Sequence, residues 1–97
     1  MTRRKSADEN RIKKIKRRSL LCRKSAKDGS IAFRYEMSFD GGGYVIGITM
    51  TGKNFSSNTE RRFPFESEKA AMDFFCFCAE CKVTPLNLVY VYEDYML

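Results

Sequence analysis

Histidine and tryptophan are both absent from the 97 residues of this chain, and proline occurs only twice. Without histidine, the chain lacks the commonest general base, the commonest metal ligand and the usual partner of a nucleophilic serine or cysteine. A chain of this length supplies one hydrophobic core. We therefore expect a small protein that is not an enzyme and that has no catalytic residues, no cofactor and no metal site.

Long apolar segments are missing as well. No run approaches the ~18 apolar residues that a membrane-spanning helix needs, and charged residues make up 31 % of the chain. The only apolar run behind the basic start is Leu20-Leu21-Cys22, which is far shorter than the ~7 to 15 residues of a secretory signal. We expect a cytoplasmic protein with no membrane contact.

Positive charge is concentrated in the first quarter of the chain. Residues 1–27 contain twelve lysines and arginines against only Asp8 and Glu9, whereas residues 28–97 contain six basic and ten acidic residues. We call residues 1–27 the basic arm. Such asymmetry indicates a nucleic acid, an anionic membrane surface or an acidic protein as the partner. An interfacial membrane helix normally presents a fuller apolar face, so the membrane is the least favoured of the three.

The local structure of the basic arm is weakly specified. Ile12, Ile15, Ser19, Cys22 and Ala26 follow the spacing of an amphipathic helix. The stripe is narrow, and the cations between residues 13 and 18 repel each other at helical neighbour distances. We expect the arm to be disordered or a marginal helix that precedes a single α+β domain at residues 28–97.

The period of the apolar residues changes to two after the arm. Alternation over residues 31–39 and again over 44–51 predicts two strands, and Asp40-Gly41-Gly42-Gly43 between them favours a hairpin turn. A second turn signal at residues 51–54 precedes a more polar third strand within residues 55–63, which is typical of a sheet edge. These patterns predict a three-stranded antiparallel meander.

Two helices are expected after the strands. Ser67 can cap a helix over residues 68–81, whose apolar residues span about 220° of the helical circumference. One sheet face cannot cover so wide an arc, so this helix packs against the C-terminal segment or against a second protomer in a homodimer. Thr84-Pro85 is a helix-start pattern, although the β-branched and aromatic residues at 88–92 favour a strand. We favour the helix, which gives an α+β fold of three strands followed by two helices.

Three short motifs resemble those of a family of short bacterial proteins, of the Firmicutes type, whose function is unknown. The motifs are Tyr44-Val45-Ile46-Gly47-Ile48, Thr84-Pro85-Leu86-Asn87-Leu88 and Glu93-Asp94-Tyr95-Met96. In that family a Tyr-Gly-Ile-like strand precedes a helix, and the chain closes with Ser/Thr-Pro-x-x-Leu and Glu-Asp-Phe/Tyr. This chain departs from the pattern at Val45-Ile46, which is inserted between tyrosine and glycine. The resemblance implies a helical C-terminal segment and a bacterial cytoplasmic or phage-related origin, and it supplies no catalytic residues.

Cysteines cluster in Cys76-Phe77-Cys78-Ala79-Glu80-Cys81. The spacing from Cys78 to Cys81 matches half a zinc site or a redox dithiol. On a helix, however, Cys76 points about 160° away from Cys78, so the three thiolates cannot converge on one ion. We expect these cysteines to be small buried hydrophobic residues.

The basic arm carries the functional prediction. Its cations can neutralise several phosphates and release their counterions, which gives binding without sequence preference. No aromatic residue precedes Phe33, so the arm cannot stack on bases. We therefore predict a non-enzymatic binding protein that contacts the phosphates of RNA or DNA. The expected nucleic-acid-binding residues are Arg11, Lys13, Lys14, Lys16, Arg17 and Arg18, with Arg61 and Arg62 extending the surface.

Two alternatives remain for the arm and the domain. The first is a protein-interaction module, such as a phage or mobile-element inhibitor, that docks on an acidic or nucleic-acid-handling protein through exposed aromatics such as Tyr90 and Tyr92. The second is an arm that serves only as a solubilising tail.

Overall fold

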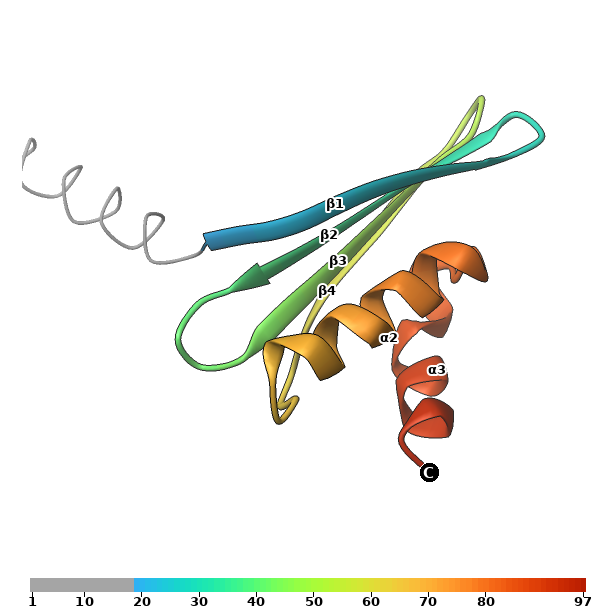
Figure 1. The fold of residues 1–97 in the computed structure, drawn as a ribbon. Coiled ribbons are helices and arrows are strands. Elements are labelled where there is room, and N and C mark those ends of the chain that lie inside the picture. Colours follow the sequence, from blue (N-terminus) through green and yellow to red (C-terminus); the bar gives the residue numbers. More distant parts are fainter. Residues whose placement is uncertain (1–18) are drawn as a thin grey trace, which may run out of the picture.

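The computed structural model describes residues 19–97 as an α+β fold in which one four-stranded antiparallel sheet packs against two helices (Figure 1). The sheet order is β1-β2-β3-β4, which is a simple meander. The prediction of three strands is therefore wrong by one strand. The elements are β1 Ser19–Asp28, β2 Ile31–Phe39, β3 Tyr44–Thr51, β4 Ser56–Phe63, α2 Glu68–Glu80, the 3-10 turn η1 Pro85–Asn87 and α3 Leu88–Tyr95.

The extra strand, β1, occupies residues that the helical pattern had assigned to the basic arm. Its whole length pairs with β2, from Ser19 opposite Phe39 to Asp28 opposite Ile31, with a bulge between Leu20 and Cys22. Partly buried Cys22 and Ala26 pack against the core. Their spacing of four residues fits one face of a strand as well as one face of a helix, and pairing with β2 decides between the two. The expectation of a helix or disorder is wrong for residues 19–27.

The other three strands confirm the alternating pattern. Phe33, Tyr35 and Met37 of β2, with Ile46 and Ile48 of β3, point toward the helices and are buried. The polar strand β4 lies at the sheet edge, as its composition predicted. The Asp40–Gly43 segment forms the predicted reversal between β2 and β3, which pair in register on both sides of it.

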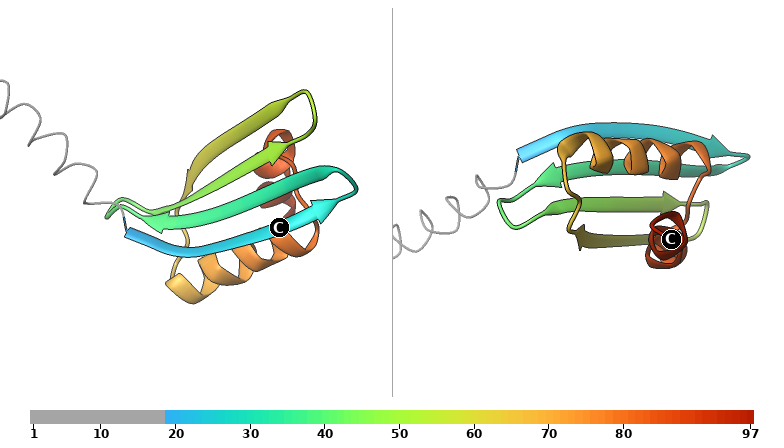
Figure 2. Two further views of the ribbon diagram at one scale, coloured as in Figure 1. Left: turned by 90° about the horizontal axis from the view of Figure 1, so that it is seen from above. Right: turned by 60° about the horizontal axis from the view of Figure 1, so that its bottom comes forward.

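Both predicted helices are present and lie on the same face of the sheet (Figure 2). The hydroxyl of Ser67 accepts a hydrogen bond of 3.1 Å from the backbone N–H of Ala70, which caps α2 as expected. Helix α2 buries Ala71, Phe74, Phe75 and Cys78 against the sheet. The C-terminal segment forms helix α3, so the prediction of a helix in place of a strand is confirmed. Helix α3 packs against α2, and the C-terminal segment was one of the two predicted partners for the wide apolar arc of α2.

An aromatic cluster joins α3 to the rest of the core. The ring of Tyr92 stacks on Phe63 of β4 with centroids 4.3 Å apart. It also meets Phe65 and Phe74 edge-on, both at 5.6 Å. Offset and edge-to-face aromatic pairs contribute about 0.5 to 1.5 kcal/mol beyond the burial of their surface. Tyr92 is thus a core residue, which corrects the expectation that its ring is exposed, whereas Tyr90 is 67 % exposed.

A buried hydroxyl ties the centre of the sheet to the connection that follows α2. Tyr35 is fully buried, and its hydroxyl donates a hydrogen bond of 2.9 Å to the backbone carbonyl of Val83. Burial, reinforced by the nearby thiols of Cys78 and Cys81, raises the pKa of Tyr35 to about 12. The phenol therefore stays protonated and remains a hydrogen-bond donor throughout the physiological pH range.

The chain leaves α2 through a left-handed residue. Lys82 has φ 52°, and its backbone N–H donates to the carbonyl of Ala79 while that of Val83 donates to Cys78. This is the Schellman arrangement, whose left-handed position usually holds glycine because a Cβ is crowded there. The turn places the backbone carbonyl of Val83 where it accepts the hydrogen bond from the hydroxyl of Tyr35.

Replacement of Tyr35 by phenylalanine tests the buried hydrogen bond. Tyr35→Phe leaves the Val83 carbonyl without its partner in the interior, so we expect the free energy of unfolding to fall by about 1 to 3 kcal/mol. Urea denaturation measures this change. Tyr90→Phe, which removes an exposed hydroxyl, is the matched control and should change stability by less than about 0.5 kcal/mol. Equal effects of the two changes would contradict the assignment.

Replacement of Lys82 by glycine tests the left-handed turn. Lys82→Gly relieves the crowding of Cβ, and we expect the free energy of unfolding to rise by about 0.5 to 1 kcal/mol. Lys69→Gly makes the same chemical change in the first turn of α2 and should lower stability by a similar amount. Thermal unfolding of both variants measures these changes in stability. A Lys82→Gly variant that is less stable than the natural protein would contradict the inference that the turn is strained.

Candidate nucleic-acid interface

The face of the sheet that points away from the helices is free of them, as the views from two sides show (Figure 2). We call it the open face. Directly opposed residues of antiparallel strands share a face, so strand register identifies its members. They are Leu20, Arg23, Ser25 and Lys27 of β1; Ala32, Arg34, Glu36 and Ser38 of β2; Val45, Gly47, Thr49 and Thr51 of β3; and Ser56, Asn58, Glu60 and Arg62 of β4.

A shallow depression of about 480 Å³ lies on the open face, near the turn between β1 and β2. Its side chains are mostly small: Ala32, the hydroxyls of Ser25, Thr49 and Thr51, and the two cations Lys27 and Arg34. Arg34 is opposite Ser25 and Lys27 is opposite Ala32, so the two cations are diagonal neighbours on adjacent strands. The depression thus combines two positive charges with several hydroxyl donors.

The basic residues of the open face differ in whether they form an ion pair with an acidic residue. Arg23 forms an ion pair of 2.8 Å with Glu36 across the β1–β2 pair. Within residues 19–97, neither Lys27 nor Arg34 forms an ion pair, and both are exposed. Lysine, arginine and hydroxyl side chains are the groups that contact nucleic-acid phosphates most often. Lys27 and Arg34 are therefore the candidate phosphate-binding residues of the open face.

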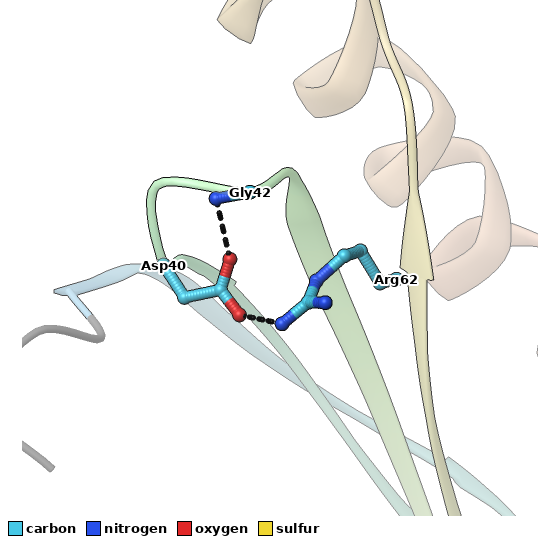
Figure 3. Close-up of polar contacts among 3 residues, drawn as sticks. All are labelled: Asp40, Gly42 and Arg62. Carbon is cyan, nitrogen blue, oxygen red and sulfur yellow. Dashed lines mark hydrogen bonds and ion pairs between the residues drawn. The ribbon is translucent and has the colours of Figure 1, made fainter. Parts of the chain in front are cut away.

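Arg62 has a structural role at the other end of the open face (Figure 3). Its guanidinium is ion-paired with the carboxylate of Asp40, which also accepts a hydrogen bond of 3.0 Å from the backbone N–H of Gly42. A Cβ on Gly43 would lie 2.9 Å from Cγ of Arg62, so glycine is required for the arginine to cross the turn. Arg62 thus anchors the β2–β3 turn to β4, although its side chain is still 57 % exposed.

The structure separates the two arginines that the sequence placed together. Arg61 is opposite Ile46 and Arg62 is opposite Val45, so they point to opposite faces of the sheet. Arg61 lines a small pocket of about 170 Å³ with Pro85, Leu86 and other residues beside η1. The other predicted phosphate ligands, Arg11, Lys13, Lys14, Lys16, Arg17 and Arg18, lie outside the described residues.

Charge is divided between the two layers of the fold. Residues 64–97, which include both helices, carry six acidic and two basic side chains, whereas the open face carries four basic and two acidic ones. Strand β1, on the sheet edge, follows directly after Arg17-Arg18 in the chain. The basic N-terminal segment, residues 1–18, is therefore joined to the strand that supplies Arg23 and Lys27.

Lys27 and Arg34 are not among the residues that the sequence predicted to bind nucleic acid. For Arg34 the signal was present, because alternation with buried Phe33 and Tyr35 places it on the solvent face of β2. For Lys27 the signal was Gly29-Ser30 after Asp28, a pattern that favours a two-residue hairpin turn. It was missed because the segment of Lys27 was expected to be helical or disordered, and strand pairing across this turn brings the two residues together.

The cysteine cluster of α2 is divided between the interior and the surface. Cys78 is fully buried, Cys76 is partly buried and Cys81 is exposed. No three histidine, cysteine, aspartate or glutamate residues gather into a metal-binding group in the described part of the chain. Burial, with a smaller contribution from Cys81, raises the pKa of the Cys78 thiol to about 12. Cys78 is consequently protonated, and unreactive as a nucleophile, at neutral pH.

Comparison of the chain with protein-family models, with curated protein sequences and with solved structures finds no match. The resemblance to short bacterial proteins of the Firmicutes type therefore stays a prediction. Among residues 19–97, no helix is long and apolar enough to cross a membrane.

Thiol labelling distinguishes the buried cysteine from the exposed one. At pH 8 we expect a maleimide to modify Cys81 at least about tenfold faster than Cys78, because the Cys78 thiol is inaccessible and protonated. Cys78 should react only on unfolding, and raising the pH to 9 should not accelerate it in the native state. Mass spectrometry of digested protein gives both rates, with Cys81→Ser as the control. Rapid native labelling of Cys78 would contradict its burial.

Proposed function

We propose that this protein is a non-enzymatic, cytoplasmic binding protein that holds nucleic-acid phosphates on the open face of its sheet and with its basic N-terminal segment. The observation that carries the proposal is the pair Lys27 and Arg34, exposed beside the hydroxyls of a shallow depression. These groups can bind phosphate oxygens by charge and by hydrogen bonding, and the proposal needs no catalytic group.

The division of charge between the layers orients the complex. The acidic helices are repelled by a polyanion, whereas the open face attracts it, so the sheet meets the nucleic acid first. Arg11, Lys13, Lys14, Lys16, Arg17 and Arg18 then add phosphate contacts from the segment that enters β1. Each neutralised phosphate releases counterions, which makes the affinity depend strongly on salt and little on sequence.

A second candidate function rests on the exposed apolar side chains of the C-terminal elements. Leu86 is 82 % exposed and Tyr90 is 67 % exposed, and they lie one helical turn apart on η1 and α3. Exposed aromatic and aliphatic residues at such spacing are typical of protein-docking surfaces. In this alternative the partner is a nucleic-acid-handling protein, and neutralising the open face should leave the interaction intact.

Paired substitutions on the two layers test the proposal. The variant Lys27→Gln/Arg34→Gln should bind a generic 20-base-pair DNA duplex about 10- to 60-fold more weakly at 0.1 M salt, because it loses two phosphate contacts. The slope of log affinity against log salt should fall by about 1.8. Fluorescence anisotropy over a salt series measures both quantities.

The matched control removes the same charge from the helical layer. Lys69→Gln/Lys82→Gln should leave the salt slope unchanged, because Lys69 lies in α2 and Lys82 in the turn after it, both in the helical layer. A variant in which glutamine replaces Arg11, Lys13, Lys14, Lys16, Arg17 and Arg18 should also have a lower salt slope. An affinity of the natural protein that stays constant between 0.05 and 0.2 M salt, roughly the range over which phosphate contacts weaken, would reject the proposal.

A further inference from the structure

Aromatic side chains are distributed unequally between the two faces of the sheet. Every aromatic ring of the four strands lies on the helix side, as strand register and burial both indicate. These rings are Phe33, Tyr35, Phe39, Tyr44 and Phe63. The open face presents small, polar and charged residues in their place, with Leu20 and Val45 as its aliphatic residues. Phe55, in the turn between β3 and β4, lies against Gly52.

This distribution bears on the kind of nucleic acid that the open face can hold. Proteins that bind single strands derive about 1 to 3 kcal/mol per base from stacking on aromatic rings. A sheet face without rings cannot supply that energy, so it has to bind by charge and hydrogen bonding alone. Lys27, Arg34 and the hydroxyls of Thr49 and Thr51 provide only such contacts.

A surface that binds by charge alone favours the more densely charged ligand. Duplex DNA carries about one phosphate per 1.7 Å of its axis, and each neutralised phosphate contributes a salt exponent of about 0.9, against about 0.7 for a single strand. For roughly five phosphate contacts, the salt exponent of the duplex exceeds that of the single strand by about one. Lowering the salt from 1 M to 0.1 M therefore raises the ratio of duplex affinity to single-strand affinity about tenfold.

The shape of the open face limits what can be recognised. Both α2 and α3 lie on the opposite side of the sheet, so no helix of residues 19–97 projects from the open face. Reading base edges in the major groove requires an inserted helix or ribbon. Contact from the open face is consequently restricted to the outer surface of the ligand, where the phosphates are.

We propose that the ligand of the open face is double-stranded nucleic acid, held through its phosphates without regard to sequence, in preference to single strands. This inference rests on the proposed function and specifies its ligand class.

Binding of matched ligands to the full chain tests the inference. We expect a 20-base-pair duplex to bind at least about tenfold more tightly than either of its separated strands in 0.1 M salt. Fluorescence anisotropy with DNA and RNA versions of one sequence and of a scrambled sequence gives the ratios. The scrambled duplex should bind within about twofold of the original, because no base is read.

A gain of stacking provides the second test. Thr49→Tyr places a ring on the open face beside Arg34 and Asn58, and strands accept tyrosine well. We expect its affinity for single strands to rise about 5- to 150-fold, which is the equivalent of one stacked base. Asn87→Tyr, which adds a ring at an exposed position of η1 in the helical layer, should leave the preference for the duplex unchanged.

The possible outcomes separate this inference from the proposal on which it rests. Tighter binding of duplex than of single strands by the natural protein, with a preference that Thr49→Tyr reduces, supports the inference. Equal or tighter binding of single strands overturns it and leaves the proposed function standing. Failure of the full chain to bind either ligand overturns both.

Discussion

The fold depends on one constraint: the central strands β2 and β3 alternate apolar and polar residues, and the two helices cover only one face of the sheet. Helices α2 and α3 both follow the sheet in the chain, and both pack on the face that carries Phe33, Tyr35 and Ile46. The buried hydroxyl of Tyr35 fixes the connection between these helices by its hydrogen bond to Val83. Because no other helix or strand of residues 19–97 covers the second face, that face has to be compatible with water or with a partner.

The open face differs from the helical layer by carrying more basic than acidic residues. Acidic residues gather in the helical layer, while Lys27 and Arg34 lie on the open sheet beside small polar side chains. Arg23 and Arg62 on the same face are held by Glu36 and Asp40, so they contribute to the structure of the sheet and its turn. A protein of two layers with opposite electrostatic character presents only one of them to a polyanion. In our proposal the basic N-terminal segment extends this surface, because β1 begins where that segment ends.

Local patterns predicted most of the fold but not the first strand. Two-residue alternation over residues 31–39 and 44–51, and the Ser67 cap of α2, correctly indicated β2, β3 and α2. Strand β1 was missed because Cys22 and Ala26, which contact the core, are spaced compatibly with a helix, and because its conformation depends on pairing with β2. The site was missed for the same reason. Arg61 and Arg62 are adjacent in sequence but point to opposite faces, whereas Lys27 and Arg34 meet only through strand register.

The central claim is that the open face, and not the helical layer, contacts nucleic acid. The most direct measurement is a nitrogen-15 NMR titration of the labelled protein with a short duplex at low salt. The account predicts that the shifted backbone signals cluster on Lys27, Arg34, Thr49 and their neighbours on the open face, with those of α2 and α3 unchanged. Signals that shift mainly along α3, around Leu86 and Tyr90, would contradict it.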